Sequence, residues 1–121
     1  MVRARDIMQK HFVGVSKTTA IASAIKLSSS AKVDLMPVLD GEKLCGVVIS
    51  DDLKNYVESE GDVGQVMRNP VFVGADSDLD GAFKVMMEHG IGRIPVVEDK
   101  LTMICVGMLS STDIVKAIKK R

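Results

Sequence analysis

The sequence predicts an α/β (α+β) fold made of two tandem repeats. Two observations predict it: apolar patterns typical of strands and of helices alternate along the chain, and the same short motifs occur in both halves. The composition agrees, because 46% hydrophobic and 26% charged residues among 121 are typical of a globular protein and exclude intrinsic disorder. We expect each repeat to run strand-helix-strand-strand-helix, with the repeats at residues 1–60 and 61–121.

The duplication is visible in four motifs that keep their order and nearly their spacing. Residues 6–8 recur as 65–67, 36–40 as 94–98, 46–48 as 107–109, and 52–53 as 113–114. A unit of roughly 60 residues buries little apolar surface alone, so we expect the two copies to pack on each other. Met8 and Met67, which open the copies, are expected to fill the core between them.

The first strand and helix of the first copy follow its opening methionine. Apolar alternation over residues 12–15 predicts a short strand. Thr18 or Thr19 can cap the helix that follows. The serine-rich stretch at residues 28–30 is a weak helix former, so the sequence does not define where this helix ends.

The second copy repeats this pattern with clearer signals. Residues 71–73 alternate as a strand would, and Asp76 or Ser77 can cap the next helix. Apolar residues at helical spacing continue that helix, and Gly90 is placed to end it.

Two strands and a final helix complete the first copy. The strands at residues 35–39 and 44–49 join through an Asp-Gly pair at 40–41, which is a strong hairpin signal. The final helix begins near Ser50, and we expect its apolar side to include residues 56–57.

The second copy ends in the same way. Its strands are expected at residues 93–97 and 103–109, with a longer turn between them, and its final helix near Ser111. The polar, glycine-containing stretch at residues 59–64 is expected to join the two halves.

Charge and composition exclude several classes of protein. The 16 Lys and Arg balance 16 Asp and Glu, whereas a nucleic-acid binder usually carries a basic excess. No apolar stretch reaches the roughly 20 residues of a membrane helix, and the charged start does not resemble a signal peptide. Cys45 and Cys105 lie in apolar segments, which argues against a disulfide scaffold or a zinc site. We therefore expect a cytoplasmic protein without a metal or cofactor.

Together, these motifs resemble a tandem pair of cystathionine-β-synthase (CBS) domains, also called a Bateman module, over residues 3–120. Each motif is degenerate, but their order, spacing and duplication are specific. The resemblance implies a regulatory module that binds an adenosine-containing ligand (AMP, ADP, ATP or S-adenosylmethionine) in clefts between the paired repeats. It also implies a homodimer whose output passes through an unknown effector protein.

The family's signature places a hydroxyl and a carboxylate at the start of the last helix, and the second copy has it intact at residues 107–114. By the resemblance, the Asp113 carboxylate accepts hydrogen bonds from the ribose hydroxyls, while Ser110 and the helix N-terminus suit a phosphate. Arg93 can pair with that phosphate. The other residues that the resemblance adds to this site are Thr112, Gly92, Ile94, Pro95, Val71 and Phe72.

The first copy departs from the signature. Ile49 stands where the hydroxyl residue belongs, although Asp52 is in place. Asp34 precedes the strand where anion recognition would favour a basic residue. We therefore expect one ligand site per chain, in the second copy. Asp52 remains a candidate ligand residue of the other cleft, which we expect to be empty or to take a less charged ligand.

Simpler functions stay open. Ser110 and Asp113 also form a helix-capping pattern that needs no ligand, and Arg93 can be a solvated charge at a strand end. The alternatives are a ligand-free dimerisation scaffold, an enzyme acting on a nucleotide, and a nucleic-acid-binding CBS protein that uses the basic tail Lys116, Lys119, Lys120 and Arg121. We expect no enzyme, because the sequence contains no Cys/His or Ser/His/Asp catalytic spacing, Walker loop or Gly-x-Gly-x-x-Gly motif.

Overall fold

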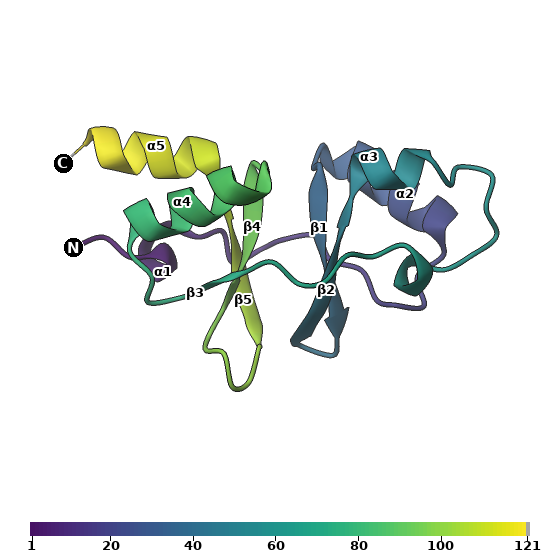
Figure 1. Ribbon diagram of the computed structural model, residues 1–121, viewed down its shortest axis with the longest axis horizontal. Helices are drawn as coiled ribbons and strands as arrows, with labels where there is room; N and C mark the ends of the chain where they lie inside the picture. Colours follow the sequence, from purple (N-terminus) through teal and green to yellow (C-terminus); the bar gives the residue numbers. More distant parts are fainter. Residues whose placement is uncertain (121) are drawn as a thin grey trace. The chain divides into compact units, whose positions relative to one another are not determined.

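The computed structural model describes residues 1–120, which form two compact units (Figure 1). The first-repeat unit is Val13–Pro70, and the second-repeat unit joins Met1–Phe12 to the chain from Val71 onward. Both units contain helices and strands, so the predicted α/β (α+β) class is confirmed. The boundaries of the two units differ from those of the two sequence repeats. The opening segment of each repeat belongs to the unit that is built mainly from the other repeat.

The first-repeat unit is a two-stranded hairpin with helices. Its elements are α2 (Ile21–Ala31), β1 (Leu35–Asp40), β2 (Lys43–Ile49), α3 (Ser50–Lys54) and the 3-10 helix η1 (Val63–Gln65). The predicted hairpin is confirmed: β1 pairs antiparallel with β2, and Gly41 supplies the positive φ of 61° that its tight turn requires. Side chains from both strands and from α2 and α3 form its core, which includes Ile21, Met36, Val38, Val48 and Leu53.

The second-repeat unit contains a three-stranded sheet in the order β3-β4-β5. Its elements are α1 (Ala4–Ile7), β3 (Val73–Gly74), α4 (Leu79–His89), β4 (Arg93–Val97), β5 (Cys105–Ser110) and α5 (Ser111–Lys119). β3 is parallel to β4, and β4 is antiparallel to β5. Gly90 ends α4 in the left-handed conformation, as predicted. α1 contacts β5 and α5, so residues from the start of the chain complete this unit.

The opening segment of each repeat docks on a strand of the other repeat. Gln9 exchanges two backbone hydrogen bonds with Met108 of β5, at N–O distances of 2.8 and 3.0 Å. Arg68 forms the equivalent pair with Val47 of β2, at 2.8 and 3.1 Å. Each unit is therefore closed by main-chain pairing to a segment that is distant in sequence.

The helix starts differ from the sequence-based expectations. α2 begins after Ala20, which offers no capping side chain, because the Thr19 hydroxyl already accepts the N–H of Ser16 in the preceding turn. α4 is capped by Asp78, beyond the two residues we expected, and its carboxylate accepts the Gly81 N–H at 2.7 Å. Both predicted caps were wrong because neighbouring Ser, Thr and Asp residues compete for the same role.

Several strand and helix lengths also differ. The strand expected at residues 12–15 reduces to a single bridge at Val15, and β3 keeps only its last expected residue and one more. β5 starts later than expected because Asp99 holds the turn before it, accepting the N–H groups of Leu101 and Thr102. α3 ends at Lys54, so residues 56–57 are exposed instead of forming an apolar helix side.

Candidate functional site

The start of α5 carries the hydroxyl and the carboxylate of the predicted site. Ser110 is the N-cap, and its Oγ accepts the backbone N–H of Asp113 at 3.1 Å. This cap uses the main chain of Asp113, so the carboxylate is left to point elsewhere. Ser110 and Asp113 are half-buried, whereas Thr112 is exposed on the first turn.

The sheet brings Gly92 and Arg93 to the same place. Arg93 opens β4 and lies directly opposite Ser110 in the antiparallel register. The Ser111 N–H donates to the Gly92 carbonyl at 2.9 Å, which fixes the approach of α5 to the start of β4. A cation, a hydroxyl and a carboxylate are therefore grouped where β5 turns into α5.

Four other predicted site residues border this group. Val73 pairs in parallel with Val96, so the residues before it, Val71 and Phe72, run beside the first half of β4. Ile94 and Pro95 are buried in the sheet, so their side chains are not on the surface. The structure thus places nine of the ten candidates, all but Asp52, in the second-repeat unit: Val71, Phe72, Gly92, Arg93, Ile94, Pro95, Ser110, Thr112 and Asp113.

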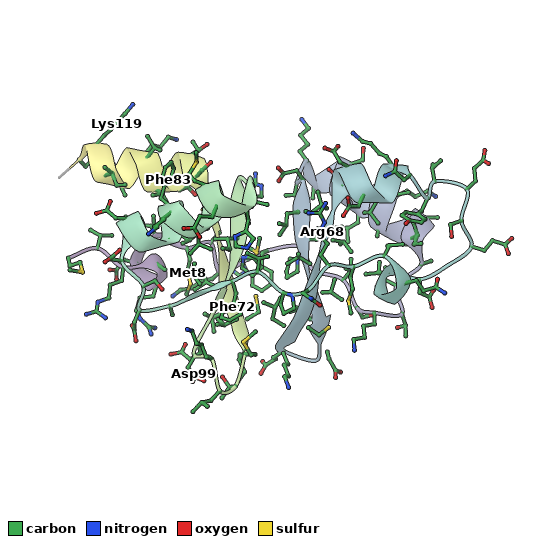
Figure 2. All side chains as sticks on the ribbon, in the orientation of Figure 1. Met8, Arg68, Phe72, Phe83, Asp99 and Lys119 are labelled. Atoms are coloured by element: carbon green, nitrogen blue, oxygen red, sulfur yellow. The ribbon has the colours of Figure 1, made fainter. Side chains whose placement is uncertain are left out.

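The carboxylates of the two repeats have different surroundings. Within residues 1–120, the Asp113 carboxylate has no hydrogen-bond or ion-pair partner. Asp52 at the start of α3 is held by Arg68, labelled in Figure 2, through two hydrogen bonds: Nε to Oδ2 at 2.7 Å and Nη2 to Oδ1 at 2.9 Å. Sequence analysis did not identify Arg68, which reaches Asp52 only because its segment docks on β2.

Arg68→Gln is expected to raise the pKa of Asp52. In the folded protein, the side-chain hydrogen bonds from Arg68 lower the pKa of Asp52 and outweigh its partial burial, which acts the other way. A lowered pKa means that the pair stabilises the fold above the ordinary carboxyl pKa, and that this contribution disappears as the pH falls through the folded-state value. The effect on unfolding is small and sensitive to salt, because the Asp52 and Arg68 side chains are 29% and 56% exposed.

The measurement is an NMR titration of the Asp52 carboxyl carbon in the wild type and in Arg68→Gln. The wild-type midpoint should lie at the lower pH. Equal midpoints would show that the hydrogen-bonded pair does not form in solution.

Two cavities lie elsewhere in the units. One of about 450 Å³ in the first-repeat unit is lined by Ile25, Ser28, Ser29, Lys32, Val33, Asp34, Ser50 and Lys54. The other, about 360 Å³ in the second-repeat unit, is lined by Met1, Val2, Asp78, Leu79, Asp80, Ala117 and Lys120. Neither of these two cavities is lined by Asp113 or Arg93.

Two kinds of feature are absent from residues 1–120. No helix there is long and apolar enough to span a membrane. In the same residues, no three His, Cys, Asp or Glu side chains gather as metal ligands would.

Known structures are similar to the chain over nearly its whole length. CBSX2 in complex with AMP is 27% identical with a TM-score of 0.84, and the match covers 99% of this chain and 98% of that one. Another structure, CBSX2 from Arabidopsis thaliana, is 26% identical with a TM-score of 0.85, covering 98% and 97%.

Curated relatives are longer proteins. The uncharacterized protein MJ1232 of Methanocaldococcus jannaschii is 27% identical over 119 residues, which are 97% of this chain and 40% of the relative. Inosine-5'-monophosphate dehydrogenase of Thermoplasma acidophilum is 26% identical over 114 residues, which are 93% of this chain and 23% of that enzyme. The chain thus spans less than half the length of either relative. The model of the CBS domain family matches residues 4–59 and 63–120, so this chain belongs to the CBS domain family and carries two CBS domains in tandem.

Proposed function

We propose that this CBS pair is a regulatory module that binds an adenosine-containing ligand at the start of α5 and signals through a partner protein. The observation that carries the proposal is the Asp113 carboxylate, half-buried in the first turn of α5 and unpaired within residues 1–120. Its two oxygens suit the two hydroxyls of a ribose. The N-terminus of α5 and the Arg93 side chain favour a phosphate next to it.

AMP is the first ligand to consider. CBSX2, similar to this chain over nearly the full length of both, has been solved in complex with AMP. ADP, ATP and S-adenosylmethionine share the adenosine part and are the other candidates. We propose a regulatory ligand instead of a cofactor. Such a ligand produces a signal only if it binds two conformations of the module with different affinities.

Calorimetric titration of the protein with these four ligands tests the proposal. We expect micromolar binding of about one ligand per chain and at least tenfold weaker binding to Asp113→Ala, since a lost hydrogen bond to a charged group typically costs that much. The Ser110 cap should persist, because it uses the main chain of residue 113. Asp52→Ala is the matched control, and it should bind like the wild type because Arg68 already occupies Asp52.

Two results would contradict the proposal. Two equivalent sites per chain would refute the preference for the second repeat. Absence of binding with all four ligands at millimolar concentration would refute ligand sensing.

A second candidate is a ligand-free scaffold that forms homodimers. It is favoured by exposed apolar side chains on three helices: Leu27 on α2, Met87 on α4 and Val115 on α5, which are 37%, 65% and 36% exposed. Where such side chains are contiguous, they are typical of protein interfaces. Sedimentation equilibrium without ligand, combined with the titration, separates the two functions: a dimer that binds none of the four ligands would be a scaffold.

A further inference from the structure

The two repeats carry different residues at one equivalent position, directly after the opening methionine. Gln9 follows Met8, and Arg68 follows Met67. Both residues exchange main-chain hydrogen bonds with equivalent positions of the last strand, Met108 in β5 and Val47 in β2. Their side chains therefore start from matching positions, beside the strand that leads into α5 and the strand that leads into α3.

In the first-repeat unit, the arginine uses both oxygens of the signature carboxylate. Nε and Nη2 of Arg68 contact Oδ2 and Oδ1 of Asp52 at 2.7 and 2.9 Å. A side-on, bidentate and charge-assisted pair of this kind is among the stronger hydrogen-bonding arrangements in proteins. The hydroxyls of a ribose would need the same two oxygens, so guanidinium and ribose exclude each other at Asp52.

The second-repeat unit lacks this obstacle. Gln9 is neutral and cannot form an ion pair with a carboxylate. In the described part of the chain, the Asp113 carboxylate is not paired. The difference between Arg68 and Gln9 thus coincides with an occupied carboxylate in one repeat and an available one in the other.

We infer that Arg68 is a specificity-determining residue: its guanidinium occupies Asp52 in place of a ribose and closes the first repeat to adenosine ligands. The inference rests on the proposed role of Asp113 as the ribose acceptor. Arg68 accounts for the expected difference in ligand binding between the two repeats through a side chain that occupies Asp52 and that a substitution can remove. Ile49 and Asp34, in contrast, only remove favourable contacts to a phosphate. Neutral adenosine is therefore the sharper probe for the first repeat, and AMP for the second.

The test is a reciprocal exchange measured by calorimetry. In an Asp113→Ala background, Arg68→Gln should bind adenosine at least about tenfold more tightly than Asp113→Ala alone, because the competing bidentate pair is gone. In the wild-type background, Gln9→Arg should weaken AMP binding by about the same factor. Adding Asp52→Asn to the Asp113→Ala/Arg68→Gln variant should remove the gained binding.

If only net charge mattered, Gln9→Arg would bind AMP more tightly than the wild type, not more weakly. A new cation in Gln9→Arg would favour an anionic ligand, so weaker binding there cannot come from net charge. Arg5→Gln is the matched control for the lost cation: Arg5 also pairs with carboxylates, Asp76 and Glu98, but far along the chain from Asp52. It should leave both affinities unchanged. Because Arg68 and Gln9 dock through their main chain, the variants should fold, and thermal unfolding checks this.

Failure of this inference differs from failure of the proposed function. A wild type that binds AMP, with adenosine and AMP affinities unchanged by Arg68→Gln and Gln9→Arg, would overturn the inference and leave the proposed function intact. A wild type that binds neither ligand would overturn the proposed function. In that case, adenosine binding by the Asp113→Ala/Arg68→Gln variant would still support the role of Arg68, and no binding would overturn both.

Discussion

Gly46→Ala is expected to lower the free energy of unfolding by about 2–3 kcal/mol, as overpacking at a tight contact does. A Cβ at position 46 would lie 2.8 Å from the Arg68 carbonyl oxygen and 2.8 Å from the Met67 sulfur. The sulfur can move, but the carbonyl oxygen accepts the Val47 N–H at 3.1 Å and cannot retreat without breaking the bridge that docks the segment. Thermal unfolding should show a midpoint lower by roughly 8–12 °C.

Gly74→Ala is the matched control, since it adds the same methyl group to a strand of the other unit. There the new Cβ would meet only the Ser77 hydroxyl, at 3.7 Å, so stability should change by less than about 0.5 kcal/mol. Gly107→Ala should fall between the two. Its closest contacts are movable side-chain atoms of Met8, at 2.7 and 2.8 Å, and the Gln9 carbonyl oxygen lies at 3.0 Å. Equal stability of Gly46→Ala and Gly74→Ala would refute close docking of the opening segment.

These contacts explain why the signature has a glycine at this position in both repeats. Gly46 and Gly107 occupy matching positions in β2 and β5, and a methionine of the other repeat's opening segment lies against each. A side chain there would separate the segment from the strand. Both glycines are thus explained by docking. Of the two carboxylates six residues later, Asp52 is paired with Arg68, whereas Asp113 is unpaired within residues 1–120.

Local sequence signals predicted most elements of the fold. The β1–β2 hairpin, the end of α4 at Gly90 and the cap of α5 at Ser110 each depend on a few neighbouring residues, and all three are present. Strand β4 matches its expected range because the four residues after Arg93 are a short apolar run that is buried throughout. The group formed by Arg93, Ser110 and Asp113 could be anticipated for the same reason, since it lies on one strand pair and the helix that follows.

The remaining features depend on contacts that no local pattern contains. The sequence places Met8 in the first repeat, yet it packs on Gly107 of the second. The Arg68–Asp52 pair is a consequence of the same docking, because it joins a residue of one repeat to the last helix of the other. The sequence does show a basic residue at position 68 and a neutral residue at the equivalent position 9. This difference predicts the Arg68–Asp52 pair only when the docking of the opening segments is known.

Ala4→Asp is expected to lower the free energy of unfolding by about 3–4 kcal/mol, because it puts a carboxylate into an apolar core. Ala4 is fully buried, its N–H donates to the Ser77 carbonyl at 2.8 Å, and it belongs to the same core as Leu79, Ile94 and Ile114. The damage should concentrate in the unit that the segment completes. Amide hydrogen exchange should therefore show lost protection mainly in β4 and β5, although residue 4 belongs to the first repeat in sequence.

The matched control is Ala22→Asp, which makes the same chemical change at an exposed position in the first turn of α2. A carboxylate near a helix N-terminus is favourable by a few tenths of a kcal/mol, so this variant should be as stable as the wild type or slightly more stable. If Ala4→Asp removed protection from β1 and β2 while β4 and β5 kept theirs, the opening segment would belong to its own repeat. Loss of protection confined to β4 and β5 would instead mean that the second CBS repeat needs the opening segment of the first to complete its core.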